Sequence, residues 1–155
     1  MFTKDFHDRA ITDIETASLL LSEKVNPTHD EGFYDIAAYH VQQGIEKELK
    51  HILGDIADES KESKRFRTHD IDNLIDYVEE VTDFRVSYDL KTMADTITSW
   101  EASSRYGESV VAFSGEIFDA INLFKELVYD VKIWNKEIEY DDFEDDPEID
   151  DDYCR

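Results

Sequence analysis

Cysteine and proline are scarce in this sequence of 155 residues, and each shortage limits the structures that the chain can form. Cys154 is the only cysteine, so the chain forms no intrachain disulfide and no zinc site built on cysteines. Pro27 and Pro147 are the only prolines, and both fall where helices are expected to have ended. No alternating run of β-branched residues predicts a strand, whereas apolar residues recur at helical spacing. The pattern predicts an all-α fold.

Long apolar runs and positive charge are also missing. No run reaches the length of a membrane span, and the N-terminal residues lack the apolar stretch of a secretory signal. We therefore expect a cytoplasmic chain without membrane contact. The 39 acidic residues outnumber 16 lysines and arginines, which gives a formal net charge of -23. Such a chain repels duplex nucleic acid, so general DNA binding is disfavoured.

The acidic residues are concentrated at the C-terminal end. Residues 137–155 hold 11 of the 39 acidic groups and a single base, Arg155. Because this segment repels itself and lacks periodicity, we predict one helical domain over residues 3–138 and a disordered acidic tail over 139–155. The tail lacks the glycine and ligand spacing of a calcium loop. We interpret it as a solubility or spacing element, with a cover over a basic surface as the alternative.

Apolar periodicity predicts an antiparallel bundle of four to five helices. The first two helices are expected over about residues 3–24 and 32–53, and Gly54 supplies a stop for the second. Thr68 or Asp70 is placed to cap the third helix. The inward positions of this third helix are Ile71, Leu74, Ile75 and Val78.

The last two helices are expected on either side of a polar break. A cap at Ser87 begins the fourth helix, which runs to about Ser99, and residues 103–107 form the break. The final helix is expected over about 109–138, a length of about 45 Å. Because such a helix overhangs a domain of this size, the sequence favours a homodimer.

The second predicted helix has two unlike faces. One side is apolar and packs inward, whereas the other concentrates donors and positive charge. Six bases stand against five acids between Lys47 and Arg67, a local excess within a strongly acidic chain. We predict a surface that contacts phosphate, and the alternative is a solvated face with local ion pairs such as Glu46–Lys50. The side chains on this polar face are His40, Gln43, Lys47, Lys50 and His51.

Three motifs, taken in order, resemble the HEPN domain family over roughly residues 3–135. A Thr-His-Asp-Ile step at 68–71 opens the third predicted helix, and Arg105-Tyr106 opens the last long one. The resemblance implies an up-and-down bundle of five helices with a long C-terminal helix. The motif in the second predicted helix consists of Ala38, Gln43, Glu46 or Lys47, Leu49 and Lys50.

Two kinds of function are implied by this resemblance. Many members of the family are metal-independent ribonucleases, often toxins, that use an Arg, four to six intervening residues and a His near the last long helix. Others bind nucleotides or other ligands, are often dimeric, and are often encoded beside small nucleotidyltransferases. Here no His follows Arg105, and only three residues separate Arg65 from His69. Since RNA cleavage needs a proton-transfer group, this departure favours binding over catalysis.

The predicted binding site lies where the second helix meets the start of the last one. Arg105 at a helix N-terminus would hold phosphate with its planar fork, and Tyr106 would position a base. Lys47 and Lys50 would supply positive charge. The alternative is that Arg105 pairs with an acid, Tyr106 fills the core and His69-Asp70 simply begin a helix. The remaining predicted site residues are Gln43, His40, His69 and Asp70.

No catalytic residue, metal site or cofactor is predicted beside this nucleotide or anion site. His40 and His51 are eleven residues apart, or three turns, so they share no metal unless ligands come from elsewhere. Two other functions stay open. One is a ribonuclease toxin with a degenerate site of Arg105 and His69. The other is a protein-interaction subunit that works with a nucleotidyltransferase or engages a basic protein through the acidic tail.

Overall fold

The computed structural model describes residues 2–22, 31–54, 64–106 and 112–137, and the predicted tail at 139–155 lies outside them. These residues form five α-helices and no strand, so the predicted all-α bundle is confirmed. None of these helices is apolar over enough residues to cross a membrane. The helices are α1 (Phe2–Leu21), α2 (Glu31–Ile52), α4 (Ile71–Val81), α5 (Tyr88–Tyr106) and α6 (Ser114–Trp134).

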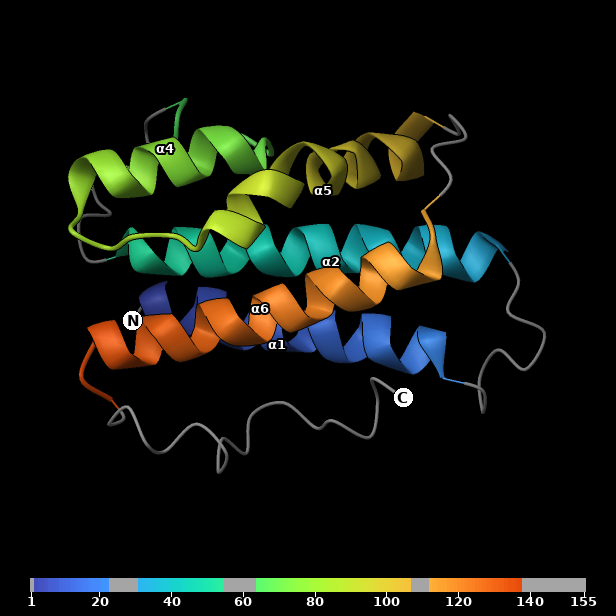
Figure 1. The fold of residues 1–155 in the computed structure, drawn as a ribbon, viewed down its shortest axis with the longest axis horizontal. Coiled ribbons are helices and arrows are strands. Elements are labelled where there is room, and N and C mark those ends of the chain that lie inside the picture. The colour runs from blue at the N-terminus through green and yellow to red at the C-terminus, as the bar shows by residue number, and fades with distance from the viewer. Residues whose placement is uncertain (1, 23–30, 55–63, 107–111, 138–155) are drawn as a thin grey trace.

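The helices run up and down around α2, which contacts each of the other four (Figure 1). Figure 1 shows α1 antiparallel to α2, with α4 and α5 following one another across the other side of α2, and α6 packs against α2 and α5. Val41, Ile45 and Leu49 are fully buried in α2 at spacings of four residues. The apolar face predicted for this helix therefore forms the centre of the core.

The first two helices approach closely because small residues line their contact. Ala10 and Ala17 of α1 are fully buried, and Gly44 of α2 lies against Ile14. A Cβ at position 44 would lie only 2.9 Å from side-chain atoms of Ile14. A glycine here therefore sets the distance between α1 and α2.

The start of α4 follows the predicted capping pattern. The side chain of Asp70 accepts a hydrogen bond from the backbone N–H of Asn73 at 2.9 Å. The predicted cap at Ser87 is also confirmed, because its hydroxyl accepts from the N–H of Leu90 at 3.3 Å. The four positions predicted to face inward on α4 are all buried: Ile71, Leu74, Ile75 and Val78.

The predicted break between the last two helices is misplaced. Helix α5 continues through residues 103–106. Ser, Arg and Tyr lower helix stability only a little, and these four positions contain no Gly or Pro. Gly107 itself lies outside the described residues. The predicted end at Ser99 is therefore wrong.

Helix α6 is shorter than predicted at both ends. It begins at Ser114 after Phe113, whose backbone is extended, and it ends at Trp134. Lys136 has a positive φ of 60°, which no α-helix accommodates. A helix of these 21 residues is about 32 Å long, so the overhang that favoured a homodimer is absent. The homodimer stays a prediction without that argument.

Candidate functional site

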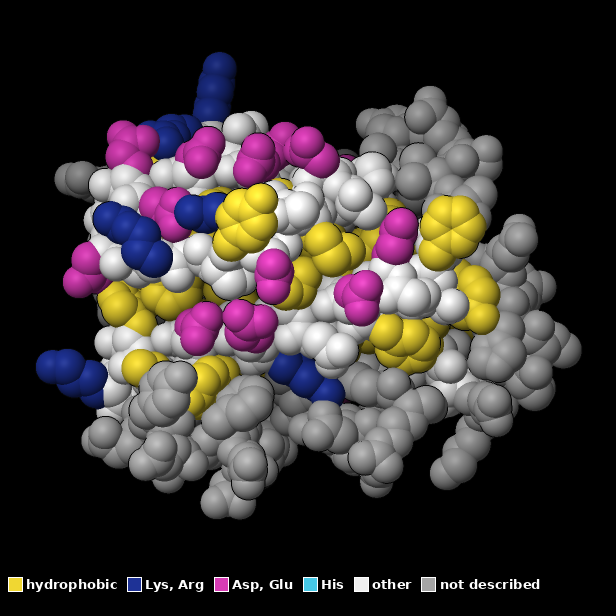
Figure 2. All heavy atoms as spheres, in the orientation of Figure 1, with side chains coloured by type: hydrophobic (Ala, Val, Ile, Leu, Met, Phe, Trp, Pro, Cys, Tyr) yellow, Lys and Arg dark blue, Asp and Glu magenta, His cyan; other side chains and the backbone are white. Residues whose placement is uncertain are grey.

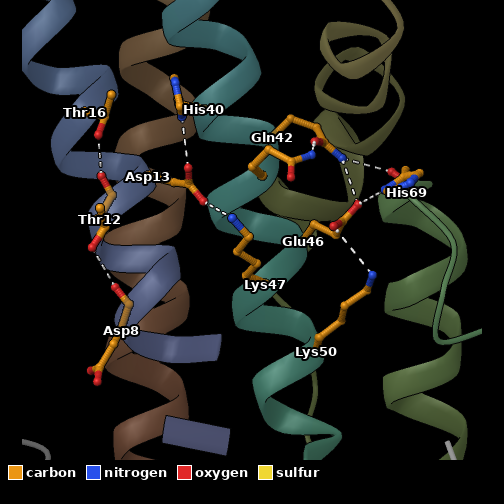
Figure 3. A network of polar contacts seen from close by, with 11 residues as sticks. Asp8, Thr12, Asp13, Thr16, His40, Gln42, Glu46, Lys47, Lys50 and His69 are labelled. Carbon is orange, nitrogen blue, oxygen red and sulfur yellow. Dashed lines mark hydrogen bonds and ion pairs between the residues drawn. The ribbon is translucent and has the colours of Figure 1, made fainter. Parts of the chain in front are cut away.

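The polar face of α2 meets a carboxylate from α1. Asp13 is largely buried and its two oxygens bind different partners, His40 at 2.9 Å and the ammonium of Lys47 (Figure 3). Antiparallel packing of α1 on α2 brings these residues together across 27 to 34 positions of sequence. One acid thus engages two of the side chains predicted to bind an anion.

A second carboxylate, Glu46, is the centre of a network on the other side of α2 (Figure 3). It is 4% exposed and accepts a hydrogen bond from Nδ1 of His69 at 2.6 Å. The ammonium of Lys50 lies 3.5 Å from its other oxygen and 5.4 Å from the ring centre of Phe66. Gln42 donates to Glu46 at 3.4 Å and to the carbonyl of His69 at 3.0 Å.

The predicted positive surface on α2 is therefore an array of ion pairs. Lys47 is held by Asp13, and Lys50 by Glu46 as the alternative interpretation predicted. Lys50 is itself only 8% exposed. Because a buried charge is stable only when it is paired, releasing either lysine to bind a phosphate would leave an acid uncompensated.

Two further predicted site residues serve the local structure. Gln43 donates to the side chain of its neighbour Gln42 at 2.7 Å. Asp70 caps α4, which is the alternative that the sequence left open for this residue. Binding of a ligand by these residues stays a prediction.

Arg105 and Tyr106 end α5 rather than opening a helix, so their predicted place at a helix N-terminus is wrong, while ligand binding by them stays a prediction. The C-terminal end of a helix carries the negative end of its dipole, which repels an anion. Their backbone belongs to α5, and their side chains lie outside the described part of the structure. The helix dipole therefore gives no reason to place a phosphate beside Arg105.

Two hydrogen bonds fix the level at which α2, α4 and α5 meet. Gln42 of α2 donates to the carbonyl of His69, and the N–H of Ile71 donates to Thr98 of α5 at 3.0 Å. Figure 1 shows that α2 and α5 run in opposite directions through this level. The part of α2 after Gln42 and the part of α5 after Thr98 therefore extend toward opposite ends of the bundle.

The predicted site residues consequently fall into two groups. Arg105 lies seven residues beyond Thr98, about 10 Å along α5 toward the start of α2. Lys47 and Lys50 lie on the other side of Gln42, toward the end of α2. The backbone positions of Arg105 and of the two lysines are therefore about 20 Å apart along the bundle.

His69 is the most accessible member of the Glu46 network. Its side chain is 45% exposed, whereas that of Glu46 is 5% exposed. A buried carboxylate thus orients an imidazole whose ring faces solvent, an arrangement used for proton transfer. Arg65 is turned elsewhere: it binds Glu80 at 2.6 Å and lies over the ring of Tyr77. The hydrogen bond to Glu80 raises the pKa of Arg65.

A groove of about 350 Å³ lies between α5 and α6. Its apolar floor includes the buried Leu123 and the half-buried Met93, while Asp89 and Asp119 are exposed on its rim. Tyr88, which precedes Asp89, is 80% exposed. Figure 2 shows acidic and hydrophobic side chains next to one another on this face. Thr92 and Asn122 complete the lining.

The acidity of this face extends along α6. Burial raises the pKa of Asp130, and repulsion from Glu126 one turn earlier raises it further. A cation placed beside these groups would be favoured, because its attraction stabilises the charged carboxylates against both effects.

His7, Glu48 and His51 form a cluster that the sequence pattern did not predict. His7 of α1 binds Glu48 of α2 at 2.9 Å, and its ring centre lies 5.3 Å from that of His51. One ligand atom from each residue lies within 4.8 Å of the other two. The three-residue spacing of Glu48 and His51 is a signal for a shared helix face, but only the register of α1 on α2 adds His7.

The up-and-down bundle is the kind of helical domain that the sequence resemblance implied, with α2 at its centre and Thr-His-Asp-Ile at the start of α4. A sequence model of the HEPN domain family matches residues 3–134. The chain belongs to the HEPN domain family, and the resemblance read from its motifs is confirmed. The comparison with curated proteins and the comparison with solved structures gave no match.

Proposed function

We propose that this chain is a non-catalytic HEPN module that binds a partner protein in the groove between α5 and α6. The observation that carries the proposal is the combination of an apolar floor, Met93 and Leu123, with a rim of Asp89 and Asp119. Grooves between helices accept an apolar helix face, and acidic rims select basic neighbours. The occupant is therefore a basic amphipathic helix.

Charge argues for a different protein rather than a second copy of this chain. A chain of formal net charge -23 repels its own copy, whereas it attracts a basic segment from a distance. The family resemblance makes a nucleotidyltransferase the first partner to examine. Nucleotide binding has weaker support, because Lys47 and Lys50 are already paired with Asp13 and Glu46.

A titration with a synthetic probe tests the groove directly. The probe is an amphipathic helical peptide with a leucine face and a lysine face, added to the full chain at about physiological salt. A scrambled peptide of the same composition measures the general attraction of a negative protein. We expect the amphipathic peptide to bind at least about tenfold more tightly than the scrambled one.

Matched variants locate the binding. Asp89→Asn with Asp119→Asn removes two charges from the groove, and Asp8→Asn with Glu15→Gln removes two exposed charges from α1. The groove pair is expected to weaken amphipathic-peptide binding about tenfold, and the α1 pair to leave it close to wild type. Equal effects of both pairs, or equal binding of both peptides, would overturn the proposal. So would a dimer of the chain that only the groove variants dissociate.

RNA cleavage is a second candidate, favoured by the His69–Glu46 pair. A half-exposed imidazole held by a buried carboxylate supports proton transfer at the 2′-hydroxyl of RNA. If this function is correct, the wild type cleaves RNA and His69→Ala loses the activity, while His40→Ala retains it. Intact RNA after long incubation with concentrated wild type would exclude this candidate.

A further inference from the structure

The start of α1 and the end of α2 bring together two imidazoles and a carboxylate. His7 lies near the beginning of α1, whereas Glu48 and His51 lie one turn apart near the end of α2. Helical spacing of three residues places Glu48 and His51 on the same face, and that face is turned toward His7. The cluster is separate from the α5–α6 groove and from the Glu46 network.

Burial distinguishes Glu48 from an ordinary surface acid. Its side chain is fully buried, and one of its oxygens, Oε2, is bound to Nδ1 of His7 at 2.9 Å. The second oxygen, Oε1, is also buried and has no hydrogen-bond partner within the described residues. An unpartnered oxygen on a buried carboxylate is costly, because it has lost its water without gaining a donor. A cation at this position would remove that cost.

The donor set selects the class of cation. Imidazole nitrogens favour zinc and its neighbours over calcium or magnesium, which prefer oxygen ligands. Two histidines and one glutamate are a known ligand combination for zinc and leave a fourth position for water or another ligand. Ligand atoms around a tetrahedral zinc lie roughly 3.4 Å apart. The observed atoms, all within 4.8 Å of one another, therefore need only small side-chain shifts.

We propose that His7, Glu48 and His51 bind one divalent transition-metal ion of the zinc class. The ion joins the first turns of α1 to the last turn of α2, so it stabilises the fold as well as filling the coordination site. This proposal goes beyond partner binding and does not depend on it. It also replaces the expectation that the chain lacks a metal site, since His7 supplies the ligand from elsewhere that His51 required.

The test uses the full chain after dialysis against a chelator. Zinc is titrated in competition with a chromophoric chelator, and excess magnesium occupies the carboxylates of the acidic C-terminal residues. Cobalt then substitutes for zinc, because its visible spectrum reports tetrahedral coordination. Cys154→Ser serves as the reference protein, so that no thiolate contributes to affinity or spectrum.

Variants assign the ligands. His51→Ala and Glu48→Gln are each expected to weaken zinc binding by at least about 100-fold, while His40→Ala retains the affinity of the reference. Zinc is expected to raise the melting temperature of the reference and of His40→Ala but not that of His51→Ala. Circular dichroism of each metal-free variant shows whether it is folded, and Glu48→Gln retains the shape of the buried side chain.

Three results would overturn the proposal. The first is that the reference protein binds no zinc once magnesium is present. The second is an octahedral cobalt complex, as expected of surface carboxylates and water. The third is that His40→Ala loses as much affinity as His51→Ala. Any one of these outcomes leaves Glu48 as a buried partner of His7 without a metal role.

Discussion

Single acidic residues join the helices and determine which cationic side chains are available to bind a ligand. Asp13, Glu46 and Glu48 are all buried in a chain that has many other acids on its surface. Each one contacts a histidine from another helix or from the segment before α4. Because a buried carboxylate must be compensated, these acids hold imidazoles and lysines that would otherwise face solvent.

The carboxylate of Glu79 joins α4 to the start of α5. Burial alone would raise its pKa, but hydrogen bonds from Lys91 at 2.8 Å and from the N–H of Val86 at 3.0 Å lower it below the usual 4.5. A lowered folded-state pKa adds stability above the unfolded value, and that stability is lost as pH falls through the folded value. Glu79→Gln should therefore lower unfolding free energy by up to about 1 kcal/mol at pH 7.

Urea unfolding at several pH values measures this effect. The difference between wild type and Glu79→Gln should shrink below pH 4.5 and vanish at lower pH. Glu80→Gln is the control, since Glu80 and its partner Arg65 are both well exposed and contribute little. A difference for Glu79→Gln that stays constant with pH would contradict the assigned charge role.

At the scale of helices, two glycines provide a test of close packing. Gly44→Ala gains about 1 kcal/mol of helix propensity, but its Cβ would lie 2.9 Å from Ile14 and 3.3 Å from the carbonyl of Ala10. Either the buried side chain of Ile14 or the two helices must shift, so we expect a net loss of about 1–2 kcal/mol. Gly115→Ala meets nothing within 4 Å and should stabilise α6 slightly. Thermal unfolding measures the melting temperatures of both variants. A higher melting temperature for Gly44→Ala would refute the close approach of α1 and α2.

The N-terminal cap of α4 provides a second test of helix stability. Asp70→Ala removes the acceptor for the N–H of Asn73 and should cost about 1 kcal/mol. Asp72 in the first turn is the control. Burial raises the pKa of Asp72, and repulsion from Asp76 raises it further, so Asp72→Asn should cost nothing. Chemical denaturation compares the two variants, and an equal loss in both would argue against a specific cap.

Local signals predicted α4 and the apolar face of α2 well, because capping and helical spacing are properties of neighbouring residues. The same signals failed at the junction of α5 and α6, because residues 103–106 continue the helix without an apolar periodicity that would have predicted it. The contact of His69 with Glu46 spans 23 residues, and that of His7 with Glu48 spans 41. Such pairings depend on how helices pack, which the sequence pattern did not specify.

For the molecule as a whole, charge repulsion should limit stability. The formal net charge is -23, and on the described surface acidic side chains lie close to one another, as at Glu126 and Asp130. Salt screens repulsion between exposed charges over about 10 Å at 0.1 M. We therefore expect the melting temperature to rise as sodium chloride increases from about 10 to 200 mM. A falling melting temperature would mean that attractive ion pairs dominate.

We propose that the α5–α6 groove, and not the lysines of α2, is the surface that binds a partner. Amide hydrogen exchange of the full chain, with and without the amphipathic peptide, distinguishes the two surfaces. We predict that protection on binding centres on residues 88–93 and 119–123, while residues 40–47 are unchanged. Protection centred on His40 and Lys47, with residues 88–93 unaffected, would contradict the account.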